Sequence, residues 1–160
     1  MPETWVGFVA SGKSVIVVGA KIPDDENNPI EILYDQTWPI QEGVGARPSG
    51  YNVLYQQCLN HLNGCKADKA VIKASATSRS GMGKAHLDGA EVRGVITAAA
   101  AAIVPVNVVA QAHISKTYGG RKVEEYVKDD QFWAQNTSGG KLRTGSRVAA
   151  MLLIAARDAA

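Results

Sequence analysis

The stretch that decides the fold is VGFVASGKSVIVVGA, from Val6 to Ala20. Its apolar and β-branched residues predict two strands, at 4–10 and 14–20, which the short glycine-containing turn 11–13 joins as a hairpin. Residues 7–14 also match the phosphate-loop pattern G-x-x-x-x-G-K-[ST]. A phosphate loop leads into a helix, whereas four consecutive β-branched residues follow Ser14. The stretch therefore predicts a hairpin and no binding of a nucleoside triphosphate.

Downstream of the hairpin, the predicted strands and helices alternate. We expect strands at 30–34, 69–74 and 106–112, and helices at 51–62, 90–103, 120–133 and 144–157. The segments 36–50 and 75–89 are rich in glycine and in proline or polar residues, which is typical of loops. Helical crossovers imply parallel strands beside the antiparallel start. The order β-β-β-α-β-α-β-α-α, which is β-β-β-α-β-α-β-α followed by a further helix, predicts one α/β domain over residues 1–160, with a mixed five-stranded sheet flanked by helices.

The composition is typical of a soluble globular protein, with 46% hydrophobic and 20% charged residues. The longest apolar stretch, 95–106, is mostly alanine and contains Pro105, so we expect no membrane span. The sequence begins Met-Pro-Glu and lacks a basic segment followed by an apolar one, which favours a cytoplasmic protein.

Four segments resemble parts of one known family. They are the hairpin at 6–20, KADKAVIKASA at 66–76, the stretch 89–120 with its RGV and SKTYGG, and GSRVAAMLLIAARD at 145–158. Together with the element order β-β-β-α-β-α-β-α, they resemble the ribonuclease H-like superfamily, in its RuvC-like Holliday-junction resolvase branch. The resemblance implies cleavage of a phosphodiester by two divalent ions. In that family a catalytic aspartate ends the first strand, a glutamate ends the fourth, and two further carboxylates lie at the start of the last helix.

The matching positions of this sequence hold no carboxylate. The residues there are Val9 with Ala10 in the first strand, Lys73 or Ala74 in the fourth strand, and Ser146 with Ala149, or Thr144 with Arg147 in another register, in the last helix. Magnesium and manganese require oxygen ligands, which these side chains mostly lack. The sequence therefore predicts a catalytically silent pseudo-nuclease, with no catalytic residues, metal or other cofactor.

The formal net charge of +2 is unevenly distributed. Residues 1–45 carry two basic and seven acidic side chains, whereas residues 46–122 carry ten basic and three acidic ones. A basic middle segment favours an anionic partner, although solvated surface charge explains it equally well. If basic residues replace the carboxylates around the family's cleft, they would neutralise backbone phosphates. The nucleic-acid-binding residues that we predict are Lys73, Arg79, Lys84, Lys116 and Arg147.

Two other functions remain open from the sequence. The first is an interaction scaffold, in which Trp38, Phe132 and Trp133 either anchor a protein partner or a second copy, or simply fill the core. The second is a divergent magnesium-dependent nuclease that uses Asp88 and Glu91 near a helix start, although acidic residues there also favour the helix dipole. His113, at the predicted end of the fifth strand, is either structural or catalytic.

Overall fold

The computed structural model describes residues 1–41, 46–76, 81 and 83–159. Within these residues, one mixed sheet has six strands in the order β5-β4-β1-β2-β3-β6. The strands are β1 (Glu3–Ala10), β2 (Ser14–Ile22), β3 (Ile30–Pro39), β4 (Lys69–Lys73), β5 (Val106–Val109) and β6 (Thr137–Gly139). The first three strands pair antiparallel, and β4, β5 and β6 are each added in parallel.

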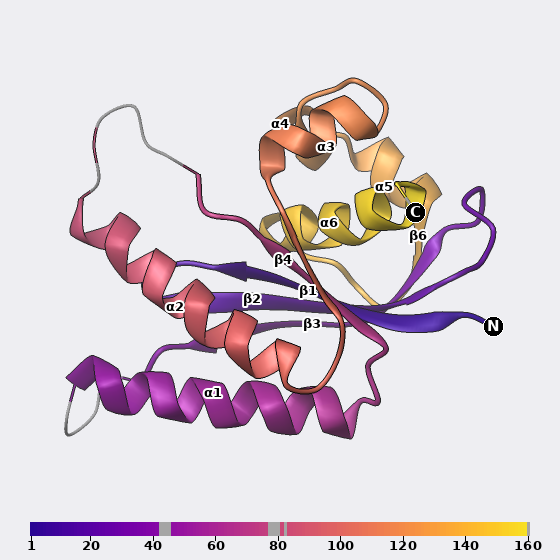
Figure 1. The fold of residues 1–160 in the computed structure, drawn as a ribbon. Coiled ribbons are helices and arrows are strands. Elements are labelled where there is room, and N and C mark those ends of the chain that lie inside the picture. The colour runs from indigo at the N-terminus through magenta and orange to yellow at the C-terminus, as the bar shows by residue number, and fades with distance from the viewer. Residues whose placement is uncertain (42–45, 77–80, 82, 160) are drawn as a thin grey trace.

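Helices cover both faces of the sheet (Figure 1). They are α1 (Ala46–Gly64), α2 (Lys84–Ala101), α3 (Gln111–Thr117), α4 (Val123–Val127), α5 (Asp130–Asn136) and α6 (Arg147–Asp158), which follows the 3-10 turn η1 (Thr144–Ser146). The long helices α1 and α2 lie side by side on one face, and α6 lies on the other face beneath α3, α4 and α5. The predicted class, an α/β fold with a mixed sheet flanked by helices, is confirmed. No helix in the described part of the chain has the length and apolar character needed to cross a membrane.

The hairpin forms the centre of the sheet because its side chains alternate between two apolar layers. In β1, Val6 and Phe8 belong to the core cluster beneath α1 and α2, whereas Trp5 and Val9 pack into the cluster around α6. This is the two-residue period of a strand with both faces covered. The motif that resembles a phosphate loop is thus a hairpin, with Lys13 at its turn rather than at a helix start.

Helix α6 is buried on all sides. Each residue from Ala149 to Ala156 is buried, because the helix packs between the sheet and the layer formed by α3 and α4. It lies close to the sheet at Gly7 in β1, where a Cβ atom would lie 2.7 Å from the backbone oxygen of Ala149. The absence of a side chain at Gly7 therefore sets the distance between α6 and β1.

The sheet has six strands where the sequence predicts five. Thr137–Gly139 pairs in parallel with Ile30–Ile32 at the edge of β3, in a segment predicted as a loop. Three residues carry no alternating pattern, so the strand depends on the unpaired edge of β3. Gly139 has φ +83°, and a Cβ atom there would lie 2.8 Å from the backbone oxygen of Ile32, so this strand end requires glycine.

The helix predicted over 120–133 is two helices. The helix is interrupted between Val127 and Asp130. The carboxylate of Asp129 accepts a hydrogen bond from the backbone N–H of Phe132 at 3.1 Å and caps α5. An aspartate at this position stabilises a new helix start rather than a continuing helix.

Other boundaries also differ from the prediction. Helix α2 begins six residues before the predicted Ala90, because Lys84 and Asp88 form an ion pair one turn apart, at 2.7 Å, and support the first turn. Helix α1 begins at Ala46, and β3 extends to Pro39. Strand β5 ends at Val109, and the rest of the predicted fifth strand belongs to α3.

Candidate nucleic-acid interface

The residues that the resemblance matches to the family's metal-binding carboxylates offer no suitable metal ligands. Val9 packs into the core around α6, Ala149 is fully buried, and the hydroxyl of Ser146 donates to Asp35 at 2.6 Å. Within the described residues, no three His, Cys, Asp or Glu side chains lie close enough together to hold a metal ion. The residues at this place therefore do not fit the divalent ions that the resemblance implies.

A basic side chain lies where β4 ends. Lys73 is half-buried, and Arg93 from α2 donates from Nε to its backbone oxygen at 2.8 Å and from a terminal nitrogen to the hydroxyl of Ser75. Burial and, to a lesser extent, the charge of Arg93 lower the pKa of the Lys73 amine, while Glu124 opposes them. Arg93 therefore fixes the backbone at the end of β4 and adds a second positive charge there.

One groove lies on the hairpin side of β4. We call it the turn groove, because Ser11, Gly12 and Lys13 form one wall; its volume is about 710 Å³. Its charged lining residues are Lys13, Arg47, Lys84, Arg93 and Asp88. Asp88 lies 2.7 Å from Lys84 and 3.7 Å from Arg47, so its carboxylate is shared between two cations. The groove thus has a positive balance.

A second groove lies between β4 and the starts of α3 and α4. We call it the β4 groove; its volume is about 770 Å³. Lys73, Lys122 and Glu124 are its charged lining residues. Gln111 donates to Glu124 at 2.8 Å, and small residues such as Ala74 and Ala112 complete the lining. Lys73 lines this groove while its partner Arg93 lines the turn groove, so the two grooves adjoin at the end of β4.

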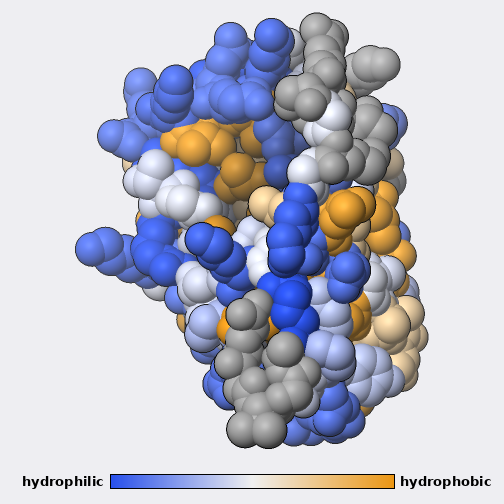
Figure 2. Space-filling view, turned by 90° about the vertical axis from the view of Figure 1, so that its left-hand side faces the viewer, coloured by the Kyte–Doolittle hydropathy of each residue, from blue (hydrophilic) through white to orange (hydrophobic). Residues whose placement is uncertain are grey.

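The face at which β1 and β4 end, the strand-end face, is seen directly in Figure 2. Hydrophilic side chains cover most of it, and hydrophobic side chains are visible in a hollow in its upper part.

The structure brings together only part of the residue set predicted to bind nucleic acid. Lys73 and Lys84 line adjoining grooves, and Arg79 lies outside the described residues. The structure places Lys116 in α3 without describing its side chain. The side chain of Arg147 is 12% exposed and donates to Asp130 and to the backbone oxygen of Val127, both at distances below 3 Å.

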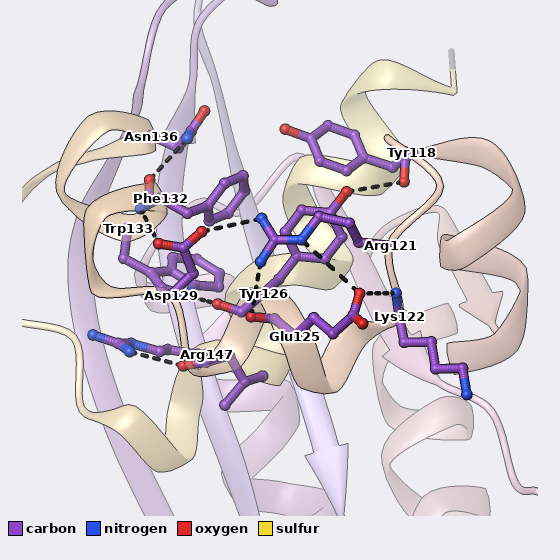
Figure 3. A network of polar contacts seen from close by, with 11 residues as sticks. Tyr118, Arg121, Lys122, Glu125, Tyr126, Asp129, Phe132, Trp133, Asn136 and Arg147 are labelled. Carbon is purple, nitrogen blue, oxygen red and sulfur yellow. Dashed lines mark hydrogen bonds and ion pairs between the residues drawn. The ribbon is translucent and has the colours of Figure 1, made fainter.

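Arg147 belongs to a network that holds the short helices on α6 (Figure 3). Its guanidinium lies over the ring of Trp133, and Arg121 lies over the ring of Tyr126 while pairing with Asp129 at 3.0 Å. These contacts join side chains within the protein, so Arg147 contributes little charge to the strand-end face.

Asp88 and Glu91, the two carboxylates considered as metal ligands of a divergent nuclease, both bind other side chains. Asp88 binds Lys84, and Glu91 accepts a hydrogen bond from the hydroxyl of Tyr51 at 2.8 Å. The bond between Tyr51 and Glu91 ties α1 to α2, whereas the bond between Lys84 and Asp88 lies within α2, and neither carboxylate is an isolated acid. His113 lies in α3 beside the edge strand β5 and lines neither the turn groove nor the β4 groove.

Of the three aromatic residues considered as anchors for a partner, Trp38 and Trp133 lie in the core. Trp38 is 5% exposed and packs against Phe8 and His61, and Trp133 is 3% exposed. Phe132 is half-buried against Tyr126. Their burial supports the structural role that the sequence analysis left open.

Sequence reasoning missed four basic residues of the two grooves: Lys13, Arg47, Arg93 and Lys122. Arg93 follows Gly89 by four residues and so shares the side of α2 that contacts the hairpin turn, but only the structure shows that contact. Arg47 had no detectable signal, because it lies in a segment that reads as a loop.

No protein-family model and no curated protein sequence matches this chain. Solved structures do match. Thermus thermophilus RuvC in complex with Holliday junction substrate has a TM-score of 0.71 at 9% identity, covering 95% of this chain and 91% of that chain. Thermus thermophilus RuvC alone has a TM-score of 0.70 at 10% identity, covering 95% and 92%. The yeast mitochondrial Holliday junction resolvase Ydc2 has a TM-score of 0.61 at 13% identity, covering 97% and 76%. At these identities the matches show the fold, and the predicted ribonuclease H-like, RuvC-like fold is confirmed.

Proposed function

We propose that this chain binds nucleic acid along the strand-end face and does not hydrolyse it with divalent ions. The observation that carries the proposal is the pair formed by Lys73 and Arg93 at the end of β4. In the resolvases that the sequence resembles, a glutamate and a metal ion occupy this position. At the strand end of this chain that resembles it, Lys73 supplies one cation and Arg93, bonded to the Lys73 backbone oxygen, supplies a second. A cation attracts a phosphate directly, whereas a carboxylate attracts one only through a metal.

The shape of the surface supports the same function. The turn groove and the β4 groove adjoin at Lys73 and Arg93, so a phosphate backbone that crosses the end of β4 meets Lys13 and Lys84 on one side and Lys122 on the other. Such contacts are insensitive to base sequence and weaken as salt concentration rises. The match to RuvC in complex with a Holliday junction substrate is consistent with a nucleic-acid partner.

Binding is expected to depend on lysines from both grooves. The variant with Lys13→Gln and Lys122→Gln, two exposed side chains, should bind duplex and branched DNA about tenfold more weakly, and the slope of log K against log salt should fall by about 2. Fluorescence anisotropy at several salt concentrations measures both quantities.

The matched control removes two exposed lysines from the opposite end of the sheet. Lys21 pairs across from Thr4 at the start of β1, and Lys66 precedes β4. The variant with Lys21→Gln and Lys66→Gln should bind as the wild type does. No binding by the wild type at low salt, or equal losses in both double variants, would contradict the proposed interface.

The absence of metal-dependent hydrolysis is a separate expectation. Intact linear and branched DNA should remain uncut when magnesium or manganese is added, because the positions that resemble the family's metal ligands hold no carboxylate and no cluster of metal-ligating side chains lies among the described residues. A denaturing gel of end-labelled strands detects incision. Cleavage that EDTA abolishes would refute this part of the proposal, and its loss in Asp88→Ala would locate the metal site in the turn groove.

A further inference from the structure

The lysine at the end of β4 is held differently from the other lysines of the two grooves. Lys13 and Lys122 are exposed, and Lys84 forms an ion pair, whereas Lys73 is half-buried at the end of a central strand. Arg93 fixes the backbone oxygen of Lys73 at 2.8 Å. Burial and Arg93 lower the pKa of this amine, which increases its neutral, nucleophilic fraction at neutral pH.

A carboxylate lies in the same groove. Glu124 lines the β4 groove together with Lys73 and is held by Gln111 at 2.8 Å. Its negative charge raises the pKa of the Lys73 amine and so partly opposes the effect of burial. Ser75 and Ser115 add hydroxyl groups to the lining. The groove therefore combines a nucleophilic amine, a base and small neutral residues that leave space for a sugar.

We propose that the β4 groove cleaves DNA at abasic sites by β-elimination, with Lys73 as the amine that forms an imine with the sugar and Glu124 as the base. This activity rests on the proposed function, because the DNA must first bind along the strand-end face. The substrate follows from the chemistry: a deoxyribose that has lost its base opens to an aldehyde, which is the electrophile that an amine attacks in DNA. No metal ion takes part.

The steps balance without an oxidant or reductant. The neutral amine of Lys73 adds to the C1′ aldehyde, and loss of one water gives an iminium ion. The carboxylate of Glu124 accepts a proton from C2′, and the electron pair released expels the 3′ phosphate by breaking the bond between C3′ and its oxygen. The abasic strand is thereby cut, and the fragment on its 3′ side begins with a 5′ phosphate. Water hydrolyses the remaining iminium ion, which returns the free amine and leaves an unsaturated aldehyde on the other strand end.

Borohydride trapping tests this directly, because borohydride reduces the iminium ion to a stable amine link. The full chain is incubated with an end-labelled duplex that carries one abasic site, in EDTA with sodium cyanoborohydride. The wild type should give a covalent adduct whose modified residue is Lys73 by mass spectrometry. Lys73→Arg keeps the charge but has no nucleophilic amine, so its adduct, measured on DNA that the variant has bound, should fall by at least about 50-fold.

Two further variants separate the steps. Lys21→Arg, at the opposite end of the sheet, should trap as efficiently as the wild type does. Glu124→Gln should still form the adduct but should cut the strand about 100-fold more slowly without borohydride, because the base is missing. Thermal melting followed by circular dichroism establishes that each variant folds.

The outcomes distinguish this inference from the proposed function. Wild-type protein that binds intact DNA but gives no adduct overturns the lyase activity and leaves nucleic-acid binding in place. An adduct that persists in Lys73→Arg, or that maps to another lysine, also overturns it. A protein that binds no DNA in the anisotropy experiment overturns both.

Discussion

Gly7→Ala is expected to destabilise the protein by about 3 kcal/mol, even though it adds a single methyl group. The new Cβ would lie 2.7 Å from the backbone oxygen of Ala149 and 3.4 Å from a methyl group of Leu153. Neither neighbour can yield cheaply, because one is helix backbone and the other belongs to a fully buried side chain. Helix α6 would have to move away from β1, and the packing of the whole helix would loosen. Urea unfolding followed by circular dichroism measures the loss.

Gly94→Ala is the matched control. Gly94 lies inside α2, and a Cβ atom there would meet nothing within 4 Å. Alanine is the better helix former, so this variant should gain about 0.5–1 kcal/mol. The same chemical change is thus expected to have opposite signs at the two positions. A Gly7→Ala variant as stable as the wild type would refute the close contact between α6 and β1.

Asp35→Asn is expected to cost about 2–4 kcal/mol at neutral pH. The carboxylate of Asp35 in β3 is 3% exposed and accepts two hydrogen bonds from the guanidinium of Arg143, at 2.7 and 3.0 Å. It also accepts from the backbone N–H of Arg143 and the hydroxyl of Ser146. These bonds join β3 to the start of α6, and an amide replaces one acceptor oxygen with a donor that faces other donors.

The pH dependence of this variant gives a second test. Burial by itself would raise the pKa of Asp35, but the bonds from Arg143 and Ser146 outweigh burial and lower it. A lowered pKa in the folded protein means that the stabilisation is complete above the ordinary aspartate pKa and is lost as the pH falls through the lower, folded value. The difference between wild type and Asp35→Asn should therefore be constant near neutral pH and shrink in acid. A difference that grows in acid would contradict this assignment; Asp25→Asn, in an exposed turn, serves as the control.

The periodic pattern of apolar residues correctly predicted the strands and helices whose own sequence favours that structure. The hairpin of β1 and β2, the strand β4 and the amphipathic helices all have side chains that repeat with the period of their own structure. Elements whose stability comes from elsewhere were missed. Strand β6 exists because β3 offers an unpaired edge, and the first turns of α2 read as a polar loop although Gly89 packs against the hairpin turn there.

The sequence could predict a residue of the candidate site only where neighbouring residues in the chain identify it. Lys73, with Ala74 as the alternative, was identified from the sequence because the surrounding residues resemble a known strand end. Its partner Arg93 lies 20 residues away in the chain, and the hydrogen bond between them depends on how α2 packs on the sheet. Arg147 was predicted from its charge alone, and nothing in the sequence indicated that Asp130 and the backbone oxygen of Val127 accept hydrogen bonds from its guanidinium.

The burial of α6 has a consequence for how the chain matures during synthesis. Residues 149–156 follow every described strand of the sheet in the chain, yet they form the centre of one of its two apolar layers. A nascent polypeptide can pair its strands and add α1 and α2 while the opposite side of the sheet, with Trp5 and Val18, still faces water. Until the ribosome has released α6, that side is exposed to chaperones and to other nascent chains, so translation that stops before residue 149 should yield an aggregating product rather than a smaller stable one.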